Sequence, residues 1–193
     1  IGGGFGNKQD VLYEPLNAFL TTQVGGRPVK LDVSREETFC NTRTRHSIEY
    51  ELTAGVDKEG HLLAKDMLEI SNQGAYASHG HSIAANGLTS FRLQYACPNI
   101  KGEAYTVYTN TPVGGAMRGY GIPQVCFACE CFMDDIAKEI GMDPLEFRKR
   151  NLIQGYYEDA YLKPIAAHTN GIFACLDKGA EYIQWDKKRK EYS

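Results

Sequence analysis

Alternating apolar and polar residues predict a strand hairpin in the middle of this 193-residue chain. From residue 48 to residue 56 every second position is apolar, which is typical of a half-buried strand. A polar turn at residues 57–60 reverses the chain, and the same alternation predicts the buried face of a returning strand, at Leu62, Ala64, Leu68 and Ile70. Residues 74–87 follow without a regular pattern.

Two further segments have the composition of strands. Residues 100–109 predict a strand that leads into a glycine-rich loop, and residues 28–33 predict a short strand near the N-terminus.

Apolar residues three and four positions apart predict helices on both sides of the hairpin. We expect these helices at residues 10–24, 123–140, 143–152 and 170–185. Ser34, followed three residues later by Glu37, predicts a capping box that opens a brief additional helix. The order of elements predicts an α+β fold, with a mixed sheet containing a hairpin and flanked by helices, in a single domain over residues 1–193.

Composition and charge narrow the choice of partners and compartment. The net charge is −3, which does not favour a nucleic-acid partner, and the basic run at residues 187–190 is interpreted as a solvated helix end. No apolar stretch approaches the ~18 residues that a membrane span requires, so no membrane association is expected. Six irregularly spaced cysteines do not form the pattern of a secreted disulfide framework and favour the cytoplasm.

The candidate chemistry lies in two glycine-rich loops. The first covers residues 1–10 and contains Gly4, Phe5 and Gly6, and the second covers residues 111–124. Glycines let backbone N–H groups approach a ligand with no Cβ in the way, and two such loops suggest two walls of one site. The first loop fits neither the phosphate-binding nor the dinucleotide-binding template, so by itself it is either a structural turn or a cofactor site.

The second loop adds an arginine and an aromatic residue among its glycines. The planar guanidinium of Arg118 suits anionic oxygens, and Tyr120 could stack against a planar ligand or bond to it. A solvent-exposed surface turn is the alternative interpretation of this loop.

Two other motifs favour structure over metal binding. Cys126, Cys129 and Cys131 lie on a predicted helix with no partner pair at zinc spacing, so we interpret them as core residues. His79 and His81 have no carboxylate pattern to complete a metal site, and a local structural role is favoured for them.

The two loops together resemble the paired signatures of the molybdenum hydroxylases, the xanthine dehydrogenase and aldehyde oxidase family. Further motifs of that family follow in the same order, at residues 34–39, 71–76, 110–112 and 143–148, so the resemblance covers nearly the whole chain. The likeness is greatest to the bacterial xanthine dehydrogenases, in which the molybdenum-binding part is a separate subunit. The resemblance implies that the chain is one part of a molybdopterin-binding domain, truncated at both ends.

For the site, the resemblance implies a molybdopterin cofactor held by Gly4, Phe5, Gly6 and Arg118, with no direct side-chain ligand to the metal. It implies that Gln9 and Tyr120 face a small heterocyclic substrate. The implied reaction is hydroxylation of a purine ring carbon, such as that of xanthine or hypoxanthine, with water as the source of oxygen. Partners implied are the remainder of the molybdenum subunit, an iron–sulfur subunit and an FAD subunit.

Departures from the family pattern keep alternatives open. The animal purine oxidases carry an acidic residue where Gln9 stands and an arginine about where Ala77 falls. An aldehyde oxidoreductase, an aryl-CoA reductase or a non-catalytic scaffold domain therefore remain alternatives. The glutamate that serves as general base in the family is expected outside this chain, so no catalytic residue is assigned within it and the fragment alone is expected to be inactive.

Overall fold

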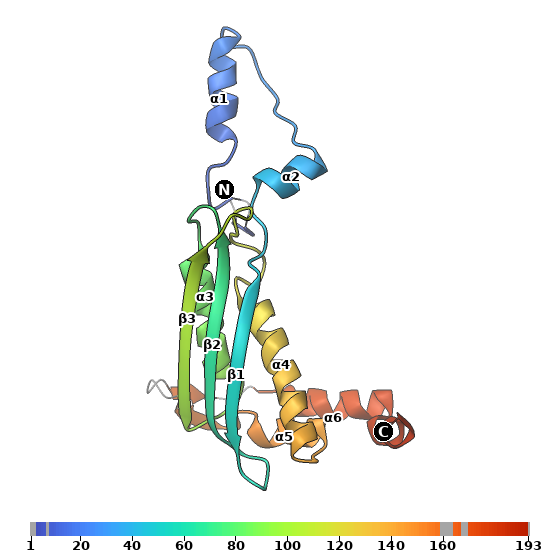
Figure 1. The fold of residues 1–193 in the computed structure, drawn as a ribbon. Helices are drawn as coiled ribbons and strands as arrows, with labels where there is room; N and C mark the ends of the chain where they lie inside the picture. Colours follow the sequence, from blue (N-terminus) through green and yellow to red (C-terminus); the bar gives the residue numbers. More distant parts are fainter. Residues whose placement is uncertain (1–2, 7, 159–163, 167–169, 193) are drawn as a thin grey trace. The chain divides into compact units, whose positions relative to one another are not determined.

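The computed structural model describes residues 3–6, 8–158, 164–166 and 170–192 (Figure 1). The chain divides into two compact units. The first comprises Ile1–Glu51, Met67–Ser90 and Gly102–Ala128, and the second comprises Leu52–Asp66, Phe91–Lys101 and Cys129–Ser193. Three residues of the predicted first glycine loop, Ile1, Gly2 and Asn7, lie outside the described residues.

A three-stranded sheet runs through the middle of the chain in the order β1-β2-β3. Its strands are β1 (Ile48–Val56), β2 (Leu62–Gly74) and β3 (Asn99–Tyr108), so the predicted hairpin and the strand that follows it are confirmed. The β1–β2 turn is closed by the Gly60 N–H, which donates to the Asp57 carbonyl over 3.1 Å.

Strands β2 and β3 run parallel, which makes the sheet mixed. The Thr109 N–H, just after β3, donates to the carbonyl of Gly74 at the end of β2, and the Asn99 side chain donates to the Leu63 carbonyl near its start. The connection between them is helix α3 (Gly80–Gln94). The α+β fold with a mixed sheet, a hairpin and flanking helices is confirmed.

The buried face of β2 is not the one that its apolar residues predict. Leu63 and Ala64 are both exposed, so the alternation slips by one position there. Beyond the slip, Leu68 and Ile70 are half-buried, whereas the buried positions are Lys65, Met67, Glu69, Ser71 and Gln73. The prediction of Leu68 and Ile70 as buried-face residues is therefore wrong, because a one-residue slip exchanges the two faces of a strand.

Helix α3 covers this polar face within the first unit. A Cβ at Gly87 would meet a carboxylate oxygen of Glu69 at 3.0 Å, so the helix backbone lies close against the strand. The segment showed no regular pattern at the level of sequence, and the helix was missed. Ile83, Gly87 and Phe91 nevertheless stand at helical spacing, and the side chains of Ile83 and Phe91 are buried.

The N-terminal helices differ from prediction at their ends. Helix α1 (Glu14–Gln23) begins four residues later than expected, because Pro15 occupies its first turn, where the missing N–H of proline is tolerated. Helix α2 (Arg35–Asn41) opens with the predicted capping box of Ser34 and Glu37, which is confirmed. No strand forms at residues 28–33, so that prediction is wrong.

The C-terminal elements belong mostly to the second unit. Helix α4 (Ile122–Glu139) and helix α5 (Pro144–Asn151) match the predicted ranges closely. The expected final helix is divided into α6 (Ile172–Ile183) and α7 (Trp185–Tyr192), because Gln184 adopts a left-handed conformation between them. A short antiparallel pair, β4 (Tyr156–Glu158) and β5 (Pro164–Ala166), was not predicted.

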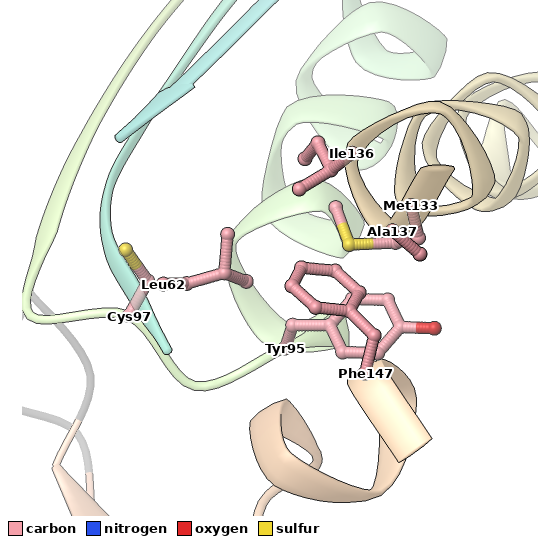
Figure 2. Close-up of a cluster of buried hydrophobic side chains, with 7 residues drawn as sticks. All are labelled: Leu62, Tyr95, Cys97, Met133, Ile136, Ala137 and Phe147. Atoms are coloured by element: carbon pink, nitrogen blue, oxygen red, sulfur yellow. The ribbon is translucent and has the colours of Figure 1, made fainter. Parts of the chain in front are cut away.

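The second unit contains an apolar cluster that joins strand, loop and helices (Figure 2). Its buried members come from β2, from the segment after α3, and from α4 and α5, and they are Leu62, Tyr95, Cys97, Met133, Ile136, Ala137 and Phe147. Of the three cysteines on α4, Cys129 is buried, Cys126 is half-buried and Cys131 is exposed, so only Cys129 is a core residue in full. In the described part of the chain, no helix is long and apolar enough to cross a membrane.

Candidate functional site

The first glycine loop is a tight turn with a strained aromatic residue at its centre. Gly3 and Gly6 adopt positive φ angles of 75° and 100°, and Phe5 adopts a φ of 54°, a conformation that bulky residues rarely take. The Lys8 N–H donates to the Gly4 carbonyl over 3.2 Å. The Phe5 side chain is 75% exposed, so the loop presents this ring to its surroundings instead of burying it.

Gln9 folds back over the same turn. A Cβ at Gly4 would meet the Gln9 Cγ atom at 2.8 Å, closer than real Cβ contacts allow. The predicted residues Gly4 and Gln9 are therefore in contact, and any side chain at position 4 would displace the side chain of Gln9.

The second loop repeats the left-handed geometry. Gly119, Tyr120 and Gly121 have consecutive positive φ angles of 94°, 50° and 96°. The turn is closed by the Tyr120 N–H, which donates to the Met117 carbonyl over 2.8 Å. Among described residues, only Phe5, Tyr120 and Gln184 are non-glycine residues with positive φ, and two of these three lie in the two loops. Such strain concentrates at functional sites.

The two loops pack directly against each other. A Cβ at Gly6 would stand 2.9 Å from the Ala116 carbonyl carbon and still nearer to its oxygen. Gly6 and Ala116 are both buried. The backbone of the first loop thus lies on the backbone of the second, and the two loops that the sequence singled out, about a hundred residues apart, form one structure.

Helix α3 contacts the second loop at Tyr120 and Gly121. The Asn86 side chain donates to the Tyr120 carbonyl over 2.7 Å. Gly121 lies against the Ile83 carbonyl, and a Cβ added at Gly121 would lie 3.3 Å from the Gly87 nitrogen. Helix α3 therefore holds the turn around Tyr120.

Two arginines that sequence analysis did not single out, Arg43 and Arg45, also contact the second loop. The Arg45 guanidinium donates to the Arg118 carbonyl over 2.7 Å and to the Gln124 side chain over 3.3 Å. Gly115 packs on the side chain of Arg43, in contact too close for any Cβ at position 115. The side chain of Arg118 itself is exposed, as a ligand-contacting group would be.

A polar network then joins the end of the first loop to Tyr120. Asp10 forms an ion pair with Arg43 and accepts a hydrogen bond from the Ser78 hydroxyl over 2.9 Å. The other carboxylate oxygen of Asp10 lies 3.6 Å from Nε2 of His79, whose Nδ1 lies 2.8 Å from the Tyr120 hydroxyl. Sequence reasoning considered His79 only together with His81, which is exposed and takes no part in this network.

Buried polar groups lie beneath the site. Glu69 is fully buried on β2, neither carboxylate oxygen has a hydrogen-bond partner in the described structure, and burial raises its pKa to about 7. His46, buried against Gly114, has its pKa lowered by burial. Within the described residues, no group of three or more His, Cys, Asp or Glu side chains is placed to hold a metal ion.

Residues 1–152 match the family model of a molybdopterin cofactor-binding domain. The chain is 45% identical over 194 aligned residues to a xanthine dehydrogenase molybdenum-binding subunit of Escherichia coli O157:H7, covering 99% of this chain and 25% of the relative. It is 37% identical over 153 residues to the large molybdopterin subunit of nicotinate dehydrogenase from Eubacterium barkeri, covering 79% of this chain and 36% of that protein.

A solved structure shares the fold over the full length of the chain. The aldehyde oxidoreductase of Desulfovibrio desulfuricans superimposes with a TM-score of 0.84 at 30% identity, covering 100% of this chain and 21% of that protein. The chain therefore spans about a quarter of the length of proteins that it resembles.

Proposed function

We propose, from the premise that this chain belongs to the molybdopterin cofactor-binding domain family, that its two packed loops form one part of the cofactor site of a molybdenum-dependent oxidoreductase. The family resemblance read from the sequence is confirmed by the match over residues 1–152. The observation that supports the proposal is the contact of Gly6 with the Ala116 backbone, by which the two glycine loops pack against each other.

The residues present fit such a cofactor. The first loop offers backbone at Gly4 and Gly6 without side chains, and it presents the exposed ring of Phe5. The second loop presents the exposed guanidinium of Arg118, whose planar fork matches anionic oxygens. Gly4, Phe5, Gly6 and Arg118 are proposed as the cofactor-contacting residues of this chain.

The cofactor, when bound, supplies the oxidative hydroxylation, and the protein binds and orients. In this division of labour, the positive φ angles at Gly3, Phe5 and Gly6 set the path of the backbone in the first loop. Arg45 and Asn86 fix the second loop by bonding its carbonyl groups at Arg118 and Tyr120. Both loops are thus preorganised before a ligand arrives, which lowers the entropy lost on binding.

We propose a purine such as xanthine or hypoxanthine as the substrate, with Gln9 and Tyr120 on the substrate side of the site. The similarity to a xanthine dehydrogenase subunit supports this choice, as does the similarity to a subunit of nicotinate dehydrogenase, because nicotinate is also an N-heterocycle. The fold likeness to an aldehyde oxidoreductase supports the alternative of an aldehyde substrate. An aryl-CoA reductase and a non-catalytic scaffold domain would both have the same fold, and they stay as alternatives to the proposed function.

The remainder of the molybdenum subunit, an iron–sulfur subunit and an FAD subunit are proposed as partners, because electrons taken from the substrate must leave the site. The general-base glutamate is proposed to come from the part of the subunit outside this chain.

Metal content and substrate range test the proposal. The full-length subunit that contains this segment is purified with its partners, molybdenum is measured by elemental analysis, and turnover is assayed with hypoxanthine, nicotinate and benzaldehyde. We expect close to one molybdenum per subunit and preferential turnover of hypoxanthine. Molybdenum with benzaldehyde turnover alone would support the aldehyde alternative, whereas absence of molybdenum would overturn the cofactor proposal.

A further inference from the structure

Side-chain contacts connect the hydroxyl group of Tyr120 in the second loop to Asp10 at the end of the first loop. The path runs from Asp10 to His79 and from His79 to Tyr120. The rings of His79 and Tyr120 meet edge to face, with centroids 5.9 Å apart and an interplanar angle of 79°. Nδ1 of His79 lies 2.8 Å from the Tyr120 hydroxyl, so the two side chains form a hydrogen-bonded pair.

Asp10 is held rigidly as the anchor of this path. One of its carboxylate oxygens is occupied by Arg43 and by the Ser78 hydroxyl, which leaves the second oxygen directed to Nε2 of His79. The Arg43 side chain is only 10% exposed, and those of Asp10 and His79 are 27% and 29% exposed. Asp10 is therefore paired with the positive charge of Arg43. Because Asp10 and His79 are only partly exposed, water weakens the attraction between them only in part.

The position of Asp10 determines which nitrogen of a neutral His79 carries the proton. A negative oxygen 3.6 Å from Nε2 favours the tautomer with the proton on Nε2, by charge attraction. Nδ1 then carries a lone pair, and the Tyr120 hydroxyl donates to it over 2.8 Å. A phenol has a single proton, so Tyr120 can present only its lone pairs to a ligand in the site.

We propose that His79 makes Tyr120 a hydrogen-bond acceptor, and that the site thereby selects substrates with a ring N–H group at the position facing this phenol. The selected class is the lactam form of N-heterocycles, in which a ring N–H stands beside a carbonyl group. Aldehydes and aromatic acids without a ring N–H lack this donor. The inference rests on the proposed function, in which Tyr120 faces the substrate.

Matched ligands test the contact in the full-length enzyme. Binding of hypoxanthine and of its single-position deaza analogues, each with C–H in place of one ring nitrogen, is measured by titration calorimetry on the molybdenum-free subunit. We expect one analogue, the one that loses the N–H facing Tyr120, to bind about tenfold more weakly than hypoxanthine. In Tyr120→Phe, hypoxanthine and that analogue bind with the same Kd.

Substitution of His79 in the molybdenum-loaded enzyme tests its role. We expect His79→Leu, whose side chain cannot accept a hydrogen bond from Tyr120, to raise the KM for hypoxanthine several-fold. In His79→Gln the side-chain oxygen can accept from Tyr120, and we expect a smaller rise. His81→Leu, two residues away and exposed, is the matched control and keeps the KM of the unsubstituted enzyme.

The outcomes separate this inference from the proposed function. An enzyme that contains molybdenum and turns over hypoxanthine, but whose Tyr120→Phe and His79→Leu variants keep the ligand discrimination and the KM, overturns the inference and leaves the proposed function intact. Turnover of aldehydes alone overturns the selection of N–H substrates. An enzyme without molybdenum overturns both.

Discussion

Replacing Gly6 with alanine should separate the two loops while leaving the rest of the chain folded. The added Cβ would stand 2.9 Å from the Ala116 carbonyl carbon, where ordinary contacts begin at 3.4 Å, and its neighbours on that side are backbone atoms that cannot rotate away. The loops must therefore move apart by several tenths of an ångström to about 1 Å, and a misplacement of about 1 Å can cost on the order of a hundredfold in function.

Strain in the backbone adds to this steric effect and must be separated from it. Gly6 has a φ of 100°, and a left-handed conformation costs an alanine roughly 1–2 kcal/mol. Gly25 supplies the matched control, since its φ is 66° but nothing lies within 4 Å of an added Cβ. Gly25→Ala thus carries the left-handed strain without the collision.

Molybdenum per subunit and the thermal unfolding midpoint, measured on the full-length protein, distinguish the two variants. We expect Gly6→Ala to lose most of its molybdenum, and Gly25→Ala to retain its molybdenum with a smaller shift of the midpoint. Valine at position 6 should act as alanine does, with helix content unchanged. Full molybdenum content in a folded Gly6→Ala protein would refute the reasoning that the contact of the loops forms the cofactor surface.

Three further substitutions test buried groups in the first and second units and the support of the second loop. Burial raises the pKa of Glu69 from 4.5 to about 7, so the folded chain keeps a proton that the unfolded chain releases between these pH values. The free energy of unfolding should therefore fall by on the order of 3 kcal/mol as pH rises from 4.5 to 7. Hydrogen exchange of the β2 amides measures this fall, and Glu69→Gln should abolish it. Asn151→Ala should destabilise the second unit by about 3 kcal/mol in denaturant unfolding, because the Leu62 N–H and two carbonyl groups lose their buried partner. Arg45→Met should lower molybdenum content by freeing the Arg118 carbonyl, with partial recovery in Arg45→Lys; unchanged content in Arg45→Met would remove Arg45 from the support of the loop.

Elements with strong local signals were predicted from sequence with good accuracy. The strand at residues 48–56 alternates without interruption, and the capping box of Ser34 and Glu37 involves residues only three positions apart. Both depend on neighbours along the chain, so the sequence contains all that is needed. The short strand expected at residues 28–33 failed because an isolated extended segment needs a partner strand, and none pairs with it among the described residues.

The site was predicted in part. The two loops were identified from their glycines, and their contact through Gly6 agrees with the expectation of one site. Their roles toward cofactor and substrate stay predictions. Asp10, Arg43 and Arg45 were missed because a single charged residue in a loop carries no pattern of its own, and His79 was considered only beside its neighbour in sequence.

The sequence by itself determined where the backbone must turn, because only glycine adopts most of the left-handed conformations at these loops without strain. It also determined the strands and most helices, through periodicities of a few residues. Only the tertiary structure decided which side chains meet. The slip at Leu63 and Ala64 turned Glu69 inward, and packing joined Asp10 to Ser78 and His79 to Tyr120 across 68 and 41 positions. Such contacts depend on how distant segments pack, and no local preference specifies them.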